Sequence, residues 1–148
     1  GVVARYTYFI VKGFARGFFH KEGKDITIWF ASEGMSLLSM NGYMYSSAGY
    51  ENVELLEECD LLKISNRVLN QLFEENTELA NWGRKLMEKT MQEYEHYFIE
   101  YYWADKGHQY QMLIKEFPQL LQRVSLKEIA SYLNITPQSL SRIRAHLK

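Results

Sequence analysis

The sequence lacks features on which several classes of protein depend. It has a single cysteine, Cys59, so no disulfide can form within the chain. No apolar run approaches the roughly 20 residues of a membrane-spanning helix, and the N-terminus lacks the charged and then apolar pattern of a signal peptide. We therefore expect a soluble protein of the reducing cytoplasm.

Motifs for enzyme chemistry are also missing. The sequence contains no phosphate-binding loop and no serine elbow. Residues 93–96 form one Glu-x-x-His motif, whereas a di-iron bundle needs two copies and further carboxylates. Cys59 lies between acidic residues, which disfavour the thiolate that a nucleophile requires. We predict no enzymatic activity, no catalytic residue, no metal site and no cofactor.

The first third of the chain is rich in aromatic and β-branched residues. They gather in short runs about ten residues apart, with polar or glycine-containing turns between them, a spacing typical of a β-barrel, roll or sandwich. Residues 36–40 predict a brief helix, and Asn41-Gly42 a turn after it. The predicted strands are residues 6–12, 14–20, 25–31, 50–56 and 59–64.

The pattern becomes helical after Ser65. Ser65 and Asn76 are expected to cap two successive helices, and the second runs to about Trp103. A helix of about 27 residues is about 40 Å long, which is more than a small domain needs for its own core. We therefore predict a two-helix dimer seam; packing against the β-domain is the alternative, and both contacts can share the face. The seam residues are Gly83, Leu86, Met87, Thr90, Tyr94, Tyr97 and Tyr101.

A further helix is predicted over residues 105–117, and after Pro118 the last 24 residues predict two short helices joined by a tight turn. Ser125 and Glu128 have the spacing of a capping box, and the small Ala130 lets a second helix cross closely. Asn134 suits a left-handed turn position. This arrangement is a helix-turn-helix, whose second helix enters the DNA major groove.

The second of these helices separates an inward face from an outward one. Thr136 is its expected cap. Leu140, Ile143 and Leu147 recur at spacings of three and four, so we expect them to face inward. The predicted DNA-binding residues are Ser125, Thr136, Pro137, Gln138, Ser139, Ser141, Arg142, Arg144 and Lys148.

Charge is distributed unevenly along the chain. Residues 105–148 contain seven Lys or Arg and three acids, whereas residues 1–104 contain ten basic and fifteen acidic residues. The formal net charge of −1 therefore hides a basic C-terminal segment on an acidic body. A basic face is what attraction to DNA phosphates requires.

In their order along the chain, these elements resemble the Crp/Fnr family of bacterial transcription regulators, and the resemblance covers essentially the whole chain. Family members normally carry several tens of residues before the first anchor, so we expect the N-terminal part of the β-domain to be missing. The anchors are residues 8–13 (Tyr-Phe-Ile-Val-Lys-Gly), 22–24 (Glu-Gly-Lys), 62–65 (Leu-Lys-Ile-Ser) and 129–133 (Ile-Ala-Ser-Tyr-Leu).

The resemblance implies an α+β fold in three segments. Residues 1–75 would form a partial antiparallel β-roll like that of cyclic-nucleotide-binding domains. Residues 76–104 would form the long dimerisation helix, and residues 105–148 the helix-turn-helix domain.

The sequence departs from the family at its ligand site. Cyclic-nucleotide-binding members hold the ribose and cyclic phosphate with a Gly-Glu pair and a downstream Arg, but residues 36–40 and 47–50 contain neither the acid nor the Arg. We therefore predict no response to cyclic AMP. One cysteine cannot replace the four ligands of the family's iron–sulfur branch. Aromatic residues that would line a pocket for another effector, or else belong to the core, are Trp29, Tyr43, Tyr45 and Tyr50.

The resemblance also assigns roles on the reading helix. Gln138 would pair with adenine and Arg142 with guanine. Pro137 stands where a family member has a guanine-reading Arg, so we expect a different operator. The predicted partners are double-stranded DNA, a second copy of the chain and RNA polymerase. The alternative is a small-molecule-binding or protein-interaction β-roll whose C-terminal helices only pack.

Overall fold

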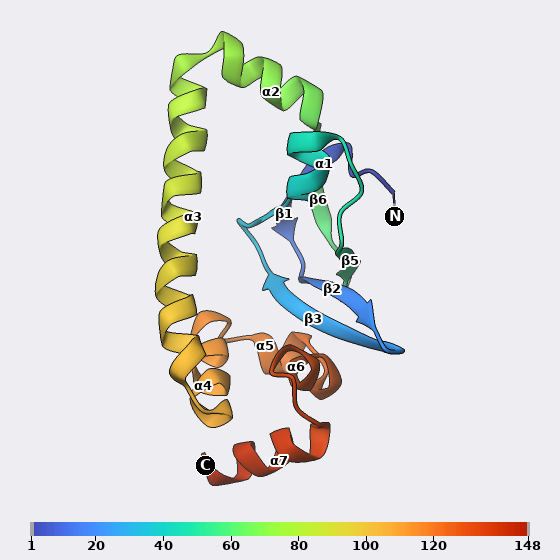
Figure 1. Cartoon of the computed structure of the whole chain (residues 1–148), viewed down its shortest axis with the longest axis vertical. Helices are drawn as coiled ribbons and strands as arrows, with labels where there is room; N and C mark the ends of the chain where they lie inside the picture. The colour runs from blue at the N-terminus through green and yellow to red at the C-terminus, as the bar shows by residue number, and fades with distance from the viewer. Residues whose placement is uncertain (1, 148) are drawn as a thin grey trace.

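The computed structural model describes residues 2–147 and has an α+β fold, in which two small antiparallel sheets precede most of the helices (Figure 1). The first sheet has the strand order β4 (Ser36–Leu37), β1 (Tyr6–Lys12) and β6 (Asp60–Ser65). The second has the order β3 (Lys24–Ala31), β2 (Ala15–Lys21) and β5 (Asn52–Leu55). The predicted β-roll is confirmed as a partial roll of these six strands.

The β2–β3 hairpin is closed by a two-residue turn. Lys21 pairs with Lys24, and the residues between them, Glu22 and Gly23, have φ angles of 52° and 74°. A turn with positive φ at both central residues matches the twist of the flanking strands, and the glycine accommodates one of the two positions without strain. The hairpin lies beside the C-terminal helices (Figure 1), and the register of its two strands shifts once, between Gly17 and Phe18.

The prediction of a helix at residues 36–40 was wrong. Ser36 and Leu37 form strand β4 on the edge of β1, because Leu37 alternates into the core with an exposure of 6%. Helix α1 (Met40–Tyr45) follows, and Asn41-Gly42 lies inside it rather than in a turn. A Cβ at Gly42 would lie 2.4 Å from the carbonyl oxygen of Ala4, so the glycine permits the close approach of the N-terminal segment.

The predicted caps of the long helices are confirmed. The side chain of Ser65 caps α2 (Asn66–Glu75), and that of Asn76 caps α3 (Thr77–Trp103). Asp105 caps α4 (Lys106–Glu116) by accepting a hydrogen bond from the backbone of His108 at 2.8 Å. Within residues 2–147, no helix combines the length and hydropathy that crossing a membrane requires.

Three short helices complete the fold: α5 (Leu120–Arg123), α6 (Leu126–Tyr132) and α7 (Pro137–His146). The sequence did not predict α5, a single turn that forms after Pro118 because the fully buried Leu120 anchors it.

The buried residues form two clusters. The smaller one fills the roll. The larger one contains Phe14 and Phe30 from the roll together with residues of α4 to α7. The first and the last of the three predicted segments therefore share one core, and the division into domains at 75 and 104 stays a proposal. The buried residues of the larger cluster are Phe14, Phe30, Tyr110, Leu113, Phe117, Leu120, Val124, Ile129, Ala130, Leu133 and Leu140.

Candidate nucleic-acid interface

Helices α6 and α7 have the local geometry of a helix-turn-helix. The capping box is complete, since Ser125 and Glu128 each accept a hydrogen bond from the other's backbone. Asn134 occupies the left-handed turn position with a φ of 53°. Thr136 caps α7 by accepting a hydrogen bond from the backbone of Ser139 at 3.1 Å. Each of these caps and the turn depends on residues only a few positions apart, which is why they could be predicted from the sequence.

The packing between α6 and α7 is tight. Ala130 has an exposure of 1% and Leu133 and Leu140 have none, so the small residue allows the crossing that was expected of it. The prediction that Leu147 faces inward was wrong, because Leu147 is the C-cap residue, lies outside the helical repeat and is 45% exposed. The two helices therefore form a rigid unit whose inward face ends at Ile143.

The outward face of α7 carries the two side chains that were predicted to read bases. Gln138 and Arg142 are exposed, and no described residue forms a hydrogen bond or an ion pair with either side chain. Arg144 is half-buried. The remaining predicted residues are Ser125, Thr136, Pro137 and Ser141, which are exposed, Ser139, which is half-buried, and Lys148, which lies outside the described residues.

The hydroxyls on this face are already ordered. Ser141 donates to the carbonyl oxygen of Pro137 at 3.0 Å, and the hydroxyls of Thr136 and Ser139 lie 3.0 Å apart. His146, which is not one of the predicted DNA-binding residues, contacts the carbonyl oxygen of Arg142 through Nδ1 at 2.8 Å. Its position in the last turn adds a basic group beside Arg142 and Arg144.

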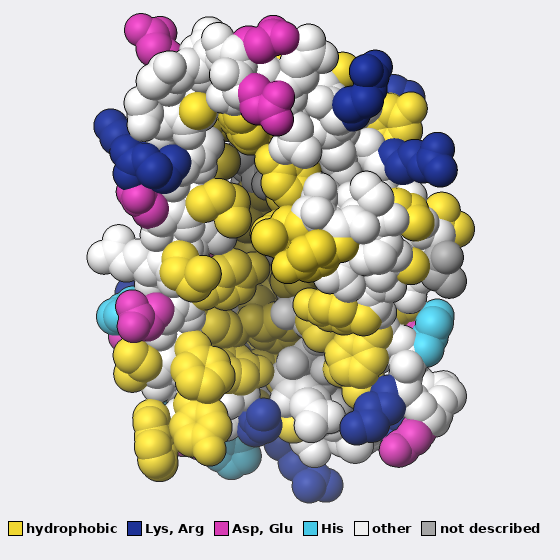
Figure 2. Space-filling view, turned by 45° about the horizontal axis from the view of Figure 1, so that its top comes forward, with side chains coloured by type: hydrophobic (Ala, Val, Ile, Leu, Met, Phe, Trp, Pro, Cys, Tyr) yellow, Lys and Arg dark blue, Asp and Glu magenta, His cyan; other side chains and the backbone are white. Residues whose placement is uncertain are grey.

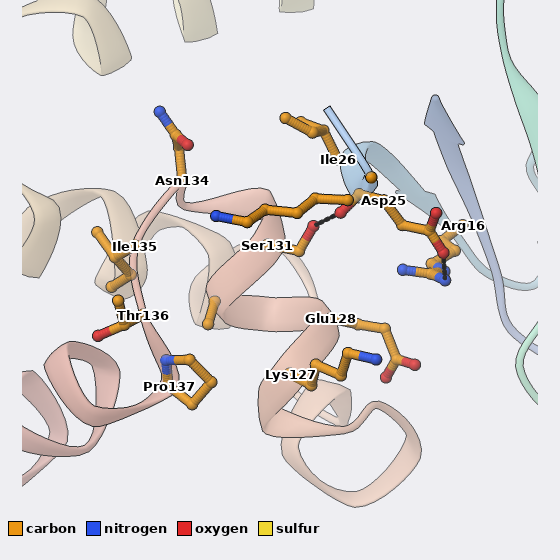
Figure 3. A pocket seen from close by; sticks show the side chains of 13 residues that line it. Arg16, Asp25, Ile26, Lys127, Glu128, Ser131, Asn134, Ile135, Thr136 and Pro137 are labelled. Atoms are coloured by element: carbon orange, nitrogen blue, oxygen red, sulfur yellow. Dashed lines mark hydrogen bonds and ion pairs between the residues drawn. The ribbon is translucent and has the colours of Figure 1, made fainter. Parts of the chain in front are cut away.

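A cavity of about 620 Å³ separates the start of α7 from the β2–β3 hairpin (Figure 3). Thr136 and Pro137 lie on one side of it and Asp25 and Arg16 on the other. Arg16 is not free to bind a ligand, because its Nε and Nη2 contact Glu54 at 2.7 and 2.6 Å. The sequence could not predict this cavity, because its walls come from segments about a hundred residues apart.

Helix α6 is seated directly on strand β3. The hydroxyl of Ser131 donates to the carbonyl oxygen of Asp25 at 2.6 Å (Figure 3), and it accepts from the backbone N–H of Thr27 at 3.0 Å. The ring of Tyr132 packs on that of Phe30, with centroids 5.4 Å apart.

A cluster of charged side chains joins α5 to the end of the roll. Arg123 donates to Glu33 from Nη1 and Nη2 at 2.9 and 2.7 Å, and to Glu57 from Nε and Nη2. Glu33 also accepts the backbone N–H of Gly13 at 2.9 Å. The hydrogen bonds from Arg123 and Gly13 lower the pKa of Glu33 to about 2, and Arg123 lowers the pKa of Glu57. The same two carboxylates raise the pKa of Arg123.

The predicted dimer helix, α3, divides its seam residues between two sides. Gly83, Thr90, Tyr97 and Tyr101 are half-buried. Gly83 lies against the ring of Phe73, and the hydroxyl of Tyr97 shares a hydrogen bond with that of Tyr132 in α6. Burial raises the pKa of Tyr97 and of Tyr101. This side of α3 therefore faces its own chain. Leu86, Met87 and Tyr94 are exposed, although Leu86 and Met87 also line a groove between α3 and the roll.

A second, uncovered apolar stripe runs along α3. Its members are separated by three or four residues, so they lie on one side of the helix. Although the helix has 27 residues, none of them is buried. The stripe residues, with their exposed fractions, are Met87 (47%), Met91 (69%), Tyr94 (61%), Phe98 (66%) and Tyr102 (66%).

An apolar groove of about 390 Å³ lies between the roll and α3, and Figure 2 shows the hollow with hydrophobic side chains along it. Of the four residues predicted for an effector pocket, Tyr43 lines this groove, and burial raises its pKa. Trp29 packs instead against the smaller core cluster, and Tyr45 and Tyr50 are 69% and 72% exposed. The structure therefore does not bring the four residues together. Among residues 2–147, no group of three or more His, Cys, Asp or Glu side chains could hold a metal ion.

Comparison with known proteins finds solved structures with a similar fold but no match to the sequence itself. No family model and no curated protein matches the sequence. The structure of FixK2 from Bradyrhizobium japonicum is similar with a TM-score of 0.81 and 15% identity, over 99% of this chain and 77% of that one. The structure of the regulator CLP from Xanthomonas campestris is similar with a TM-score of 0.69 and 16% identity, over 99% of this chain and 79% of that one.

A transcriptional regulator of the Crp/Fnr family from Eubacterium rectale also gives a TM-score of 0.69 and 16% identity, over 96% of this chain and 68% of that one. At such identities the likeness concerns the fold. Over nearly its whole length, the chain has the fold of Crp/Fnr-type transcription regulators, as the sequence predicted.

Proposed function

We propose that this protein is a dimeric, sequence-specific DNA-binding transcription regulator of the Crp/Fnr type, acting in the cytoplasm. The observation that carries the proposal is the outward face of α7, where Gln138 and Arg142 are exposed on a helix whose opposite face is fixed by the fully buried Leu140. A rigid helix with unpaired polar side chains on its outer face is what reading base edges requires.

The roles of the side chains follow from their chemistry. Gln138 is assigned to adenine and Arg142 to guanine, each contributing about 1–3 kcal/mol of discrimination. Ser125, Thr136, Ser139, Ser141 and Arg144 are assigned to phosphates, together with Lys148. Pro137 has no side-chain donor, so the base beside it would be read by contact alone.

A second copy of the chain is the partner that the uncovered stripe of α3 requires. Packing of Met87, Met91, Tyr94, Phe98 and Tyr102 against the same residues of another copy would bury five large apolar side chains. This seam is rotated from the predicted one, because Gly83, Tyr97 and Tyr101 already face their own chain. Two reading helices would then address half-sites about 34 Å apart. RNA polymerase is a further proposed partner.

The groove beside α3 supports the proposal that the roll does not bind cyclic AMP in the usual way. Its walls include Phe9, Leu38, Tyr43 and Phe73, and the one arginine that lines it, Arg84, already contacts Glu88 at 2.5 Å, so the groove offers few free groups that could bind a phosphate. Isothermal titration with cyclic AMP is expected to give no binding heat, and micromolar binding would contradict this part of the proposal.

The whole function can be tested by selecting bound duplexes from a random pool. A regulator should enrich a two-fold symmetric sequence, and its affinity for random DNA should fall steeply as salt is raised. Arg142→Ala should weaken the preference for the selected sequence more than the affinity for random DNA. Arg67→Ala, on the exposed face of α2, is the matched control and should change neither. Absent or salt-independent binding would favour the alternative, a ligand- or protein-binding roll whose C-terminal helices only pack.

A further inference from the structure

Arg123 connects the C-terminal helices directly to two separate parts of the roll, and to a third through Glu33. Glu33 lies between β3 and β4, Glu57 lies between β5 and β6, and Gly13, which donates to Glu33, lies between β1 and β2. All three guanidinium nitrogens of Arg123 are used in these contacts. The partners are 90 and 66 residues away along the chain, so the contacts fix tertiary structure and not the local helix.

The environment of Arg123 makes these contacts more than an ordinary surface ion pair. Its side chain is 16% exposed, and the guanidinium lies 4.9 Å from the centroid of the Phe14 ring. A planar guanidinium that binds one carboxylate through two nitrogens and stacks on an aromatic ring is held in one orientation. Exposed pairs such as Arg84–Glu88, by contrast, lie along one face of a single helix and orient nothing beyond it.

The position of Arg123 in the chain passes this orientation on to the reading helix. It is the last residue of α5, and Ser125, two residues later, caps α6. Helix α6 has its own contact with the roll through Ser131 and β3, and α7 is fixed to α6 by their common core. Two anchors at different points of the unit determine both its position and its rotation on the roll.

We propose that Arg123 is a positioning residue for DNA recognition: it holds the helix-turn-helix in one orientation on the roll and thereby fixes the separation of the two reading helices in a dimer. The inference rests on the proposed function for its DNA part. Its structural part, one orientation of α7 relative to the roll, can be measured without DNA.

The structural part is tested by the distance between two spin labels, attached at Asn52→Cys in β5 and Ala145→Cys in α7. Both positions are exposed, and every sample carries Cys59→Ser and is diluted with unlabelled chain. The otherwise unmodified protein should give one narrow distance distribution. Arg123→Gln should at least double its width, Arg123→Lys should have a smaller effect, and Arg84→Gln should have none. A folded Arg123→Gln protein with an unchanged distribution would overturn the proposal.

The DNA part is tested on the selected operator with its central spacer changed by one or two base pairs. The wild type should discriminate strongly between spacers, whereas Arg123→Gln should lose at least fivefold of that discrimination and keep its affinity for random DNA. A role in stability alone would instead lower all affinities together and leave the spacer preference unchanged, and that result would overturn the proposal. If Arg123→Gln does not fold, Glu57→Gln, which removes one of the two partners, is measured in its place.

The two experiments separate the possible failures. A wild type that binds no DNA contradicts the proposed function, while the label distances still decide whether Arg123 fixes the orientation of α7. A wild type that binds DNA with strong spacer preference, together with an Arg123→Gln protein that shares it, contradicts the role of Arg123 alone.

Discussion

Helices α6 and α7 and helix α3 are all amphipathic, but they differ in how completely the chain covers their apolar residues. In the helix-turn-helix, Ile129, Leu133 and Leu140 have no exposed surface. In α3, which is longer than both helices together, no residue is buried, and Phe98 and Tyr102 are each 66% exposed. The apolar residues of the first region are covered by its own chain, whereas many of those in α3 stay exposed to solvent.

The difference shows how the structure of a single chain can reveal the surface on which a partner binds. An apolar residue of the helix-turn-helix stabilises the fold of the single chain. The exposed residues of α3 gain that stabilisation only when a partner covers them, and a contiguous exposed apolar stripe on a helix is typical of an interaction surface. The experiments below alter these regions one at a time, and the last one alters the contact by which α5 holds the helix-turn-helix on the roll.

The largest effect is expected from Leu140→Ala. Leu140 is fully buried in the cluster that joins the helix-turn-helix to the roll, so its truncation leaves a cavity and should lower the free energy of unfolding by about 2–5 kcal/mol. Chemical denaturation measures the loss. Leu147→Ala, at a position 45% exposed, should change stability by less than about 1 kcal/mol. Equal effects of the two variants would show that α7 is not packed as described.

The next effect concerns association and not folding. Phe98→Glu should place a charge in the proposed seam of α3 and weaken dimerisation by at least about 3 kcal/mol, or more than a hundredfold. Analytical ultracentrifugation measures the dissociation constant. Ile99→Glu is the matched control, because Ile99 is also exposed, at 58%, but lies outside the stripe. A dimer weakened equally by both variants would place the seam elsewhere on the helix.

The same contrast explains how much the sequence could predict. The caps of α6 and α7 and the turn at Asn134 depend on residues a few positions apart, so their pattern is visible in the sequence. For α3 the period of the apolar residues could be predicted from the sequence, but not the side of the helix that faces its own chain. That side is decided by Tyr132 and Phe73, which belong to other elements.

Arg123 shows the same limit within the candidate site. Its charge was visible in the sequence as part of the basic C-terminal segment, but its partners are carboxylates in the roll. No local spacing relates Arg123 to Glu33 or Glu57, so only the folded chain distinguishes it from the exposed Arg142. The short strand β4 was missed for a similar reason, since its pairing with β1 outweighed the local preference of residues 36–40.

A smaller effect is expected on the DNA side of the helix-turn-helix. Arg142→Ala should reduce discrimination between the selected operator and variants at one base pair by about 1–3 kcal/mol, because a guanidinium reads guanine through two hydrogen bonds. Binding titrations on single-base operator variants measure it. Arg142 is exposed, and its side chain forms no hydrogen bond or ion pair within the described residues, so thermal stability should stay nearly unchanged. Loss of stability without loss of preference would mean that Arg142 supports the fold and does not read DNA.

The smallest effect is a pH dependence of the contact between α5, which leads into the helix-turn-helix, and the roll. The pKa of Glu33 is about 2 in the folded protein, below its ordinary value of 4.5, so its interaction with Arg123 is complete above pH 4.5 and weakens as the pH falls toward 2. The stability difference between wild type and Glu33→Gln should therefore be largest near neutral pH and shrink below pH 4.5. Because the Glu33 side chain is 42% exposed, solvent screens the interaction and the difference is modest. Glu88→Gln, which breaks the exposed pair within α3, is the control. A difference that grows on acidification would contradict the direction of this pKa shift.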